Sequence, residues 1–78
     1  MRNKKVNGRK FVICLKNRGY KASLELRKIY QVLPDADADS MGQLRIIDES
    51  GEDYLYPADW FASIELPQSL EKALLKAS

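Results

Sequence analysis

Short apolar runs that alternate with polar residues dominate this sequence. The pattern predicts five strands, over residues 10–16, 28–33, 43–48, 52–56 and 61–66. These segments are rich in β-branched and aromatic residues and end at Gly, Pro, Asn or charged residues, as strands do. Glu49-Ser50-Gly51 between the third and fourth strands has the length of a hairpin connection. In the first strand, Phe11, Ile13 and Leu15 share one face while Val12 and Cys14 share the other. We therefore expect that strand to be covered on both sides.

The segments between these strands are harder to interpret. Residues 20–33 fit both a helical stripe and alternation, and we favour a loop before the second strand because Pro34 pushes the preceding residue toward extended geometry. A helix over residues 21–30 stays as the alternative. Residues 34–42 are expected to be an acidic, mobile loop. Its three alternate aspartates lack the glycine and glutamate that complete a calcium loop.

The end of the chain predicts a helix over residues 67–78. Pro67 is a favourable first helical residue, and Leu70, Ala73, Leu74 and Ala77 recur at the spacing of an amphipathic helix. We expect this helix to pack on the rest of the domain.

Composition limits the class of protein. A chain of 78 residues builds one core, and its apolar share of 45% is that of a globular domain. Cys14 is the single cysteine, and the apolar run after the basic N-terminus is too short for a signal peptide or a membrane span. These features predict a cytoplasmic domain outside the membrane.

Charge is divided between the two parts of the chain. Residues 1–30 hold ten Lys or Arg side chains against Glu25 alone, whereas residues 31–78 hold three cations and ten acids. This division indicates either a polyanion-binding arm or neutralisation through cross-strand ion pairs, and we favour neutralisation.

The order of elements resembles that of an SH3-like barrel, in which the first strand pairs with the last. Residues 56–61, Tyr-Pro-Ala-Asp-Trp-Phe, resemble the short 3₁₀ segment of SH3 domains, which implies that Pro57 and Trp60 face a groove and that Phe61 is buried. The sequence departs from proline-binding SH3 domains, because residues 10–15 lack their Ala-Leu-Tyr-Asp-Tyr motif and Gln43-Leu44 stands where they carry a tryptophan. Residues 47–57 also resemble a group of small uncharacterised bacterial proteins. We expect a mainly β, five-stranded SH3-like barrel over residues 10–66, a flexible basic arm over residues 1–9 and the C-terminal helix.

No residue set predicts catalysis. Without histidine, the usual acid–base, triad and imidazole–metal chemistries are absent. A mid-strand Cys14 is expected to be an inert, buried thiol. We therefore expect no enzyme activity, no cofactor and no metal site.

Two binding surfaces are predicted. The first is aromatic and comprises Tyr54, Tyr56, Pro57 and Trp60. Its rings fill either the core or a surface patch; with five acids nearby, a patch would suit a basic protein or peptide. The alternative is nucleic-acid binding by the basic arm, through Arg2, Lys4, Lys5, Arg9 and Lys10. Oligomeric state is not predicted.

Overall fold

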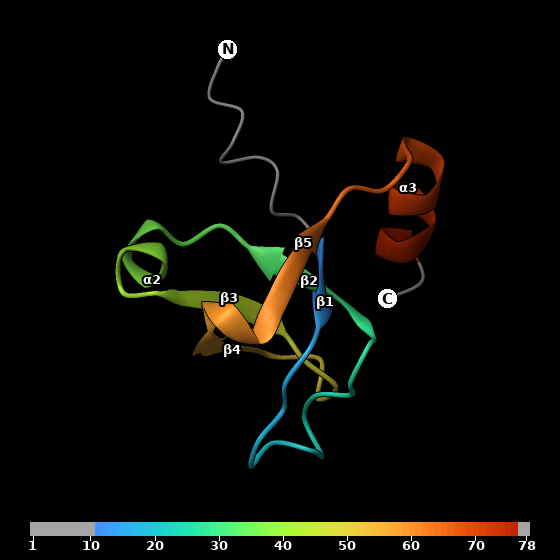
Figure 1. Ribbon diagram of the computed structural model, residues 1–78. Helices are drawn as coiled ribbons and strands as arrows, with labels where there is room; N and C mark the ends of the chain where they lie inside the picture. The colour runs from blue at the N-terminus through green and yellow to red at the C-terminus, as the bar shows by residue number, and fades with distance from the viewer. Residues whose placement is uncertain (1–10, 77–78) are drawn as a thin grey trace.

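The computed structural model describes residues 11–76 and contains one five-stranded antiparallel sheet (Figure 1). The elements are β1 (Phe11–Cys14), β2 (Ile29–Leu33), α2 (Ala36–Ser40), β3 (Gln43–Ile47), β4 (Asp53–Pro57), the 3₁₀ helix η1 (Ala58–Trp60), β5 (Phe61–Ile64) and α3 (Gln68–Lys76). The strand order is β4-β3-β2-β1-β5, so the last strand pairs with the first. The mainly β class and all five predicted strands are confirmed. No pairing among the described residues joins β4 to β5, so closure into a barrel is not confirmed.

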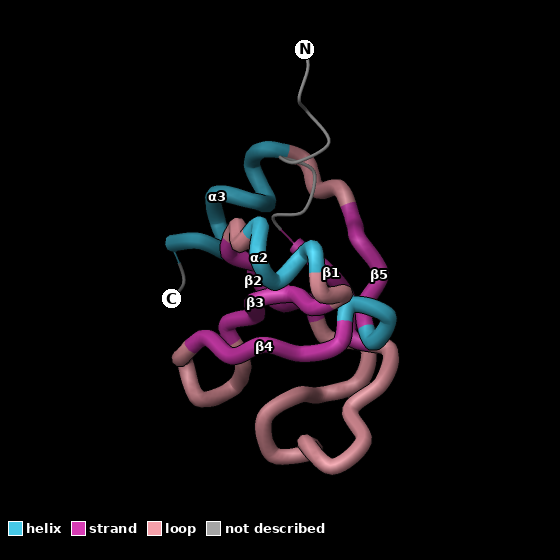
Figure 2. Tube along the Cα trace, turned by 90° about the vertical axis from the view of Figure 1, so that its left-hand side faces the viewer, coloured by secondary structure: helices cyan, strands magenta, loops and turns pink. Residues whose placement is uncertain are grey.

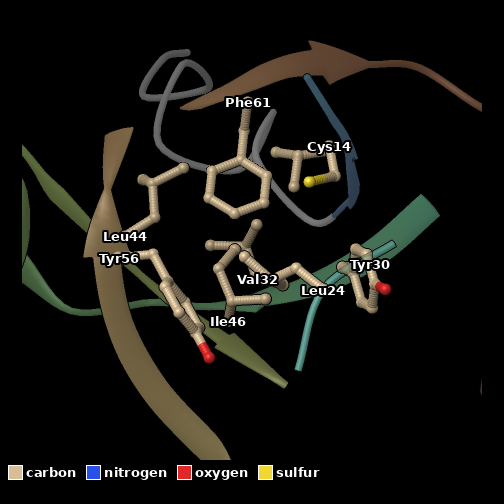
Figure 3. Packing of buried hydrophobic residues seen from close by; sticks show 9 residues of the cluster. Cys14, Leu24, Tyr30, Val32, Leu44, Ile46, Tyr56 and Phe61 are labelled. Carbon is tan, nitrogen blue, oxygen red and sulfur yellow. The ribbon is translucent and has the colours of Figure 1, made fainter. Parts of the chain in front are cut away.

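The hydrophobic core lies on one face of this curved sheet (Figure 3). Alternate residues of the strands point into it, as the period-2 pattern requires. The cluster consists of Val12, Cys14, Leu24, Tyr30, Val32, Leu44, Ile46, Tyr56 and Phe61. Eight of these residues belong to strands, whereas Leu24 comes from the long first connection and is fully buried. That connection is therefore part of the fold.

The first strand is buried more unevenly than its sequence predicts. Val12 and Cys14 are fully buried in the core. Phe11 on the opposite face is buried too, with 4% of its surface exposed. Leu15, which was expected to share the face of Phe11, lies after the end of β1 and is half exposed. Cover on both sides therefore holds at Phe11 but not at Leu15.

Residues 15–28 form an irregular loop, so the helix over residues 21–30 is wrong. The loop is held by backbone hydrogen bonds to the strands: Arg27 N donates to Cys14 O at 2.7 Å, and Cys14 N donates to Lys28 O at 2.9 Å. In both whole-chain views it lies below the sheet, whereas α3 lies above (Figures 1 and 2).

The expectation of an acidic loop over residues 34–42 is wrong at residues 36–40, which are helical. This segment contains α2, whose first turn is capped by the Asp35 carboxylate accepting from Ala38 N at 3.0 Å. Ala38 is buried, and Arg45 of β3 donates to Asp35 at 2.7 Å. Gly42, with a φ of +72°, lets the chain leave α2 and enter β3.

The C-terminal helix α3 starts at Gln68, one residue after the predicted start. Leu70 on this helix is 43% exposed and Leu74 is half-buried. Close packing of the whole apolar face on the sheet stays a prediction. Among the described helices, none has the length and apolar character needed to cross a membrane.

Candidate functional site

Three aromatic rings from three separate segments meet beside the core. The ring centroid of Tyr20 lies 5.4 Å from that of Tyr56, edge to face, and 5.8 Å from that of Trp60. Tyr56 and Trp60 stack at 6.2 Å with their planes 28° apart. We call these three residues the aromatic patch. Such contacts stabilise aromatic pairs beyond the effect of buried area.

Local backbone geometry explains how the rings come together. Strand β4 ends at Pro57, because proline lacks the amide donor that a longer strand would need, and η1 begins at the next residue. Trp60 O accepts from Leu15 N at 2.7 Å and from Lys16 N at 3.2 Å, so the start of the first loop is fastened to η1. A turn follows in which Tyr20 N donates to Asn17 O at 2.8 Å, with Gly19 at a φ of +76°.

The structure separates the four residues of the predicted aromatic surface. Tyr56 is 4% exposed and belongs to the core, so of the two positions that the sequence left open for this ring, the core is the one it takes. Its pKa is raised to about 12 by burial and by the hydrogen bond to Asp48. Tyr54, which shares its side of the strand, is half exposed and lies nearer the turn of the hairpin, opposite Ile46. Pro57 and Trp60 are half-buried, and Trp60 packs against the core.

Phe61 is buried, as the resemblance to the SH3 segment implies. Residues 58–60 also form the expected 3₁₀ turn. A binding role for Tyr54, Pro57 or Trp60 stays a prediction.

Tyr20 is the residue that sequence analysis missed. Its side chain is 49% exposed although its ring touches two other aromatic rings. In the sequence it follows Arg18-Gly19 at the start of the ambiguous residues 20–33, and it belongs to neither the helical stripe nor the alternation found there. The Asn17-Arg18-Gly19 turn signal was the one local indication that the next side chain is presented at a fixed angle.

Asp48 is a buried acid that directly follows β3, at the start of the turn to β4. Its carboxylate accepts from Ser50 N at 2.9 Å, from the Ser50 hydroxyl at 2.6 Å and from the Tyr56 hydroxyl at 2.6 Å. Burial raises the pKa of Asp48, but the hydrogen bonds from Ser50 and Tyr56 outweigh it and hold that pKa below its usual value. Asp48 is therefore a structural anion.

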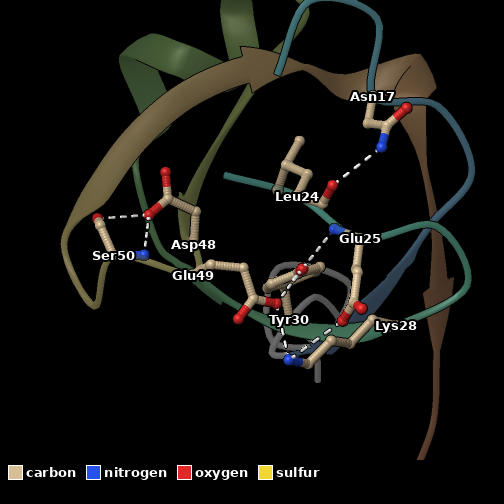
Figure 4. A network of polar contacts seen from close by, with 8 residues as sticks. All are labelled: Asn17, Leu24, Glu25, Lys28, Tyr30, Asp48, Glu49 and Ser50. Atoms are coloured by element: carbon tan, nitrogen blue, oxygen red, sulfur yellow. Dashed lines mark hydrogen bonds and ion pairs between the residues drawn. The ribbon is translucent and has the colours of Figure 1, made fainter. Parts of the chain in front are cut away.

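Glu49 fastens the hairpin to the first loop (Figure 4). Its carboxylate accepts from the buried Tyr30 hydroxyl at 2.5 Å and pairs with Lys28 at 2.7 Å. These two contacts lower the pKa of Glu49. The Tyr30 hydroxyl in turn accepts from Glu25 N at 2.7 Å, and burial is the main cause of its raised pKa. The network joins β2, the first loop and the hairpin.

The charges around the aromatic patch differ from those the sequence predicted. Of the five acids near residues 54–61, four have partners: Asp48 and Glu49 as above, Glu52 with the Tyr54 hydroxyl and Asp53 with Arg45. Asp59 alone has none within the described residues. Of the cations in residues 11–30, Lys28 alone pairs with an acid in the described part of the chain. Within residues 11–76, the ion pair between Lys28 and Glu49 is thus the one link that joins the basic part to the acidic part.

Within residues 11–76, no three His, Cys, Asp or Glu side chains gather as a metal site would require. Cys14 is fully buried, burial raises the pKa of its thiol, and its Sγ donates to Lys16 O at 3.2 Å. A raised pKa disfavours the thiolate that nucleophilic attack needs.

The basic arm of residues 1–9, with Arg2, Lys4, Lys5, Arg9 and also Lys10, lies outside the described residues. Nucleic-acid binding by it stays a prediction. Comparison of this chain with protein-family models, curated proteins and solved structures finds no match.

Proposed function

We propose that this chain is a non-catalytic protein-interaction module that binds a peptide segment of its partner at the aromatic patch. The observation that carries the proposal is the presentation of Tyr20: its ring is half exposed, yet it is held against Tyr56 and Trp60. A large ring that is already ordered loses little conformational entropy when a ligand covers it. Aromatic anchors of this kind dominate binding energy in many interfaces.

The proposal includes an SH3-like barrel in a bacterial, cytoplasmic protein. The pairing of β1 with β5 and the 3₁₀ turn between β4 and β5 support the barrel. A single, buried cysteine supports a reducing compartment.

A random peptide library displayed on phage, selected against the full chain, tests this function. Selected peptides are then synthesised and titrated, with the fluorescence of Trp60, the single tryptophan, as the readout. We expect Tyr20→Ala to raise the Kd by about tenfold or more, as for a binding hot spot. Tyr20 is the preferred target because Trp60 also packs against the core, so its removal would affect folding.

Met41→Ala is the matched control, because it also removes a large exposed apolar side chain, 65% exposed, from the turn after α2. Circular dichroism and denaturant unfolding establish that both variants fold. Equal affinities of the wild type and the folded Tyr20→Ala variant, or a selection that enriches no peptide, would show that the patch is not a ligand site.

A further inference from the structure

Among the described residues, the unpaired charges beside the aromatic patch are mostly positive, with three cations against Asp59. Lys16, Arg18 and Lys21 are exposed and flank Tyr20 in the first loop. None of the three forms an ion pair within residues 11–76, whereas the acids of the neighbouring hairpin, Asp48, Glu49 and Asp53, all have partners. A ligand that approaches Tyr20 therefore meets unpaired cations.

The backbone that carries these cations is held by hydrogen bonds. Lys16 N is bonded to Trp60 O, and the turn from Asn17 to Tyr20 carries Arg18 at its tip. After the turn, Ser23 N and Leu24 N both donate to Tyr20 O, at 3.0 and 2.9 Å. The backbone of Lys21, which directly follows Tyr20, is thus held within this turn. Charges arranged around an apolar contact select partners by complementarity.

We propose that the peptide segment bound at the aromatic patch is acidic, with an apolar side chain against Tyr20 and Trp60 and carboxylates facing Lys16, Arg18 and Lys21. This inference rests on the proposed function and specifies its partner. It reverses the basic partner that the acid-rich sequence of residues 48–59 predicted, because the structure engages most of those acids internally.

Ring geometry favours a peptide over a single-stranded nucleic acid. Successive bases require free ring faces on which to stack. Here Tyr56 is buried and Trp60 is half-buried and stacks on it, so Tyr20 is the one half-exposed ring of the three and a row of stacked bases would find a single exposed ring. Asp59 next to Trp60 also opposes a chain that carries a phosphate at every nucleotide, whereas a peptide places its acids only where cations lie.

Charge reversal in the loop tests the inference on the same phage selection. We expect the selected peptides to be enriched in Asp and Glu together with apolar residues, and their affinity to fall with added salt. The double variant Arg18→Glu, Lys21→Glu should raise the Kd of a synthesised peptide about tenfold, since it removes two exposed ion pairs with the ligand and places like charges there. The same change in net charge on α3, through Gln68→Glu, Ser69→Glu and Lys72→Glu, serves as the control and should leave the Kd unchanged.

The outcomes separate the two levels of the proposal. Selected peptides that depend on Tyr20 but are rich in Lys and Arg would overturn the acidic partner and leave the interaction module standing. An equal loss of affinity in the loop and α3 variants would likewise reject the assigned cations. If oligothymidylate, tested in parallel at low salt, binds more tightly than any selected peptide and loses affinity in the loop variant, the ligand is a nucleic acid and the inference fails.

Discussion

Removal of the Asp48 carboxylate should destabilise this domain severely. Asp48 is 6% exposed and accepts three hydrogen bonds, one of them from the hydroxyl of the buried Tyr56. A hydrogen bond to a charged group contributes about 1.5–3 kcal/mol, and a buried hydroxyl that loses its acceptor costs about 1–3 kcal/mol. Because the Ser50 bonds are local to the turn, we take the Tyr56 bond as the main loss and expect Asp48→Ala to cost about 3 kcal/mol.

Urea unfolding monitored by circular dichroism measures this loss directly. For a domain of this size, about 3 kcal/mol lowers the melting temperature by roughly 12–24 °C. Asp48→Asn keeps the shape and one acceptor oxygen, so about half that loss is expected. Asp59→Asn is the control, because Asp59 is exposed and has no partner in the described residues; its effect should stay within about 0.5 kcal/mol. If Asp48→Ala lost no more free energy of unfolding than the Asp59→Asn control, the structural role of the Asp48 carboxylate would be refuted.

The pH dependence of stability gives an independent check on Asp48. Its pKa is lower in the folded chain than in the unfolded chain, where aspartate titrates near about 3.9. The unfolded chain therefore binds the proton first, and the contribution of Asp48 is complete above that value and lost as pH falls through the folded pKa. Between about pH 6 and pH 2, the wild type should lose more stability than Asp48→Asn. Parallel pH profiles would contradict the assigned role.

Two further predictions concern buried polar groups. Tyr30→Phe removes the hydroxyl that links Glu49 to the backbone of Glu25, so we expect a loss of about 1–2 kcal/mol in urea unfolding, and no change would show that the link adds nothing. The Cys14 thiol is fully buried with a raised pKa, so Ellman's reagent should label it only after denaturant unfolds the chain; labelling of the native protein at the rate of a free thiol would refute its burial.

Strands were predictable because their pattern is local. Alternation and the short Gly-containing turn were enough to define β3 and β4, and Pro67 marked the start of α3. The helix α2 was missed because it has five residues and depends on partners elsewhere. Asp35 is a readable N-cap, but the burial of Ala38 and the contact with Arg45 are tertiary. Repeated Asp-Ala units alone are typical of a solvated loop.

The candidate site was only half predictable for a related reason. Tyr56 and Trp60 were visible as an aromatic cluster in the sequence, but Tyr20 joins them through a contact across 36 and 40 positions. The sign of the free charge depends on which charged groups pair, and pairing follows from distances that a linear sequence does not contain. The five acids near Trp60 are visible in the sequence, but the hydrogen bonds and ion pairs that engage four of them are not.

The first loop, residues 15–28, has no regular secondary structure and yet holds the ring of Tyr20 in a defined place. Several hydrogen bonds hold the loop. The Asn17 side chain donates to Leu24 O at 2.9 Å, and Glu49 N donates to Ser23 O at 2.9 Å. Glu49 also accepts from Tyr30 and pairs with Lys28. Glu49 is thus one of several residues that hold the loop carrying Tyr20, and because its carboxylate is engaged by Tyr30 and Lys28, it does not offset the unpaired cations of that loop. Order of the ring and sign of the charge therefore arise from the same contacts, which is why we assign affinity and selectivity to a single surface.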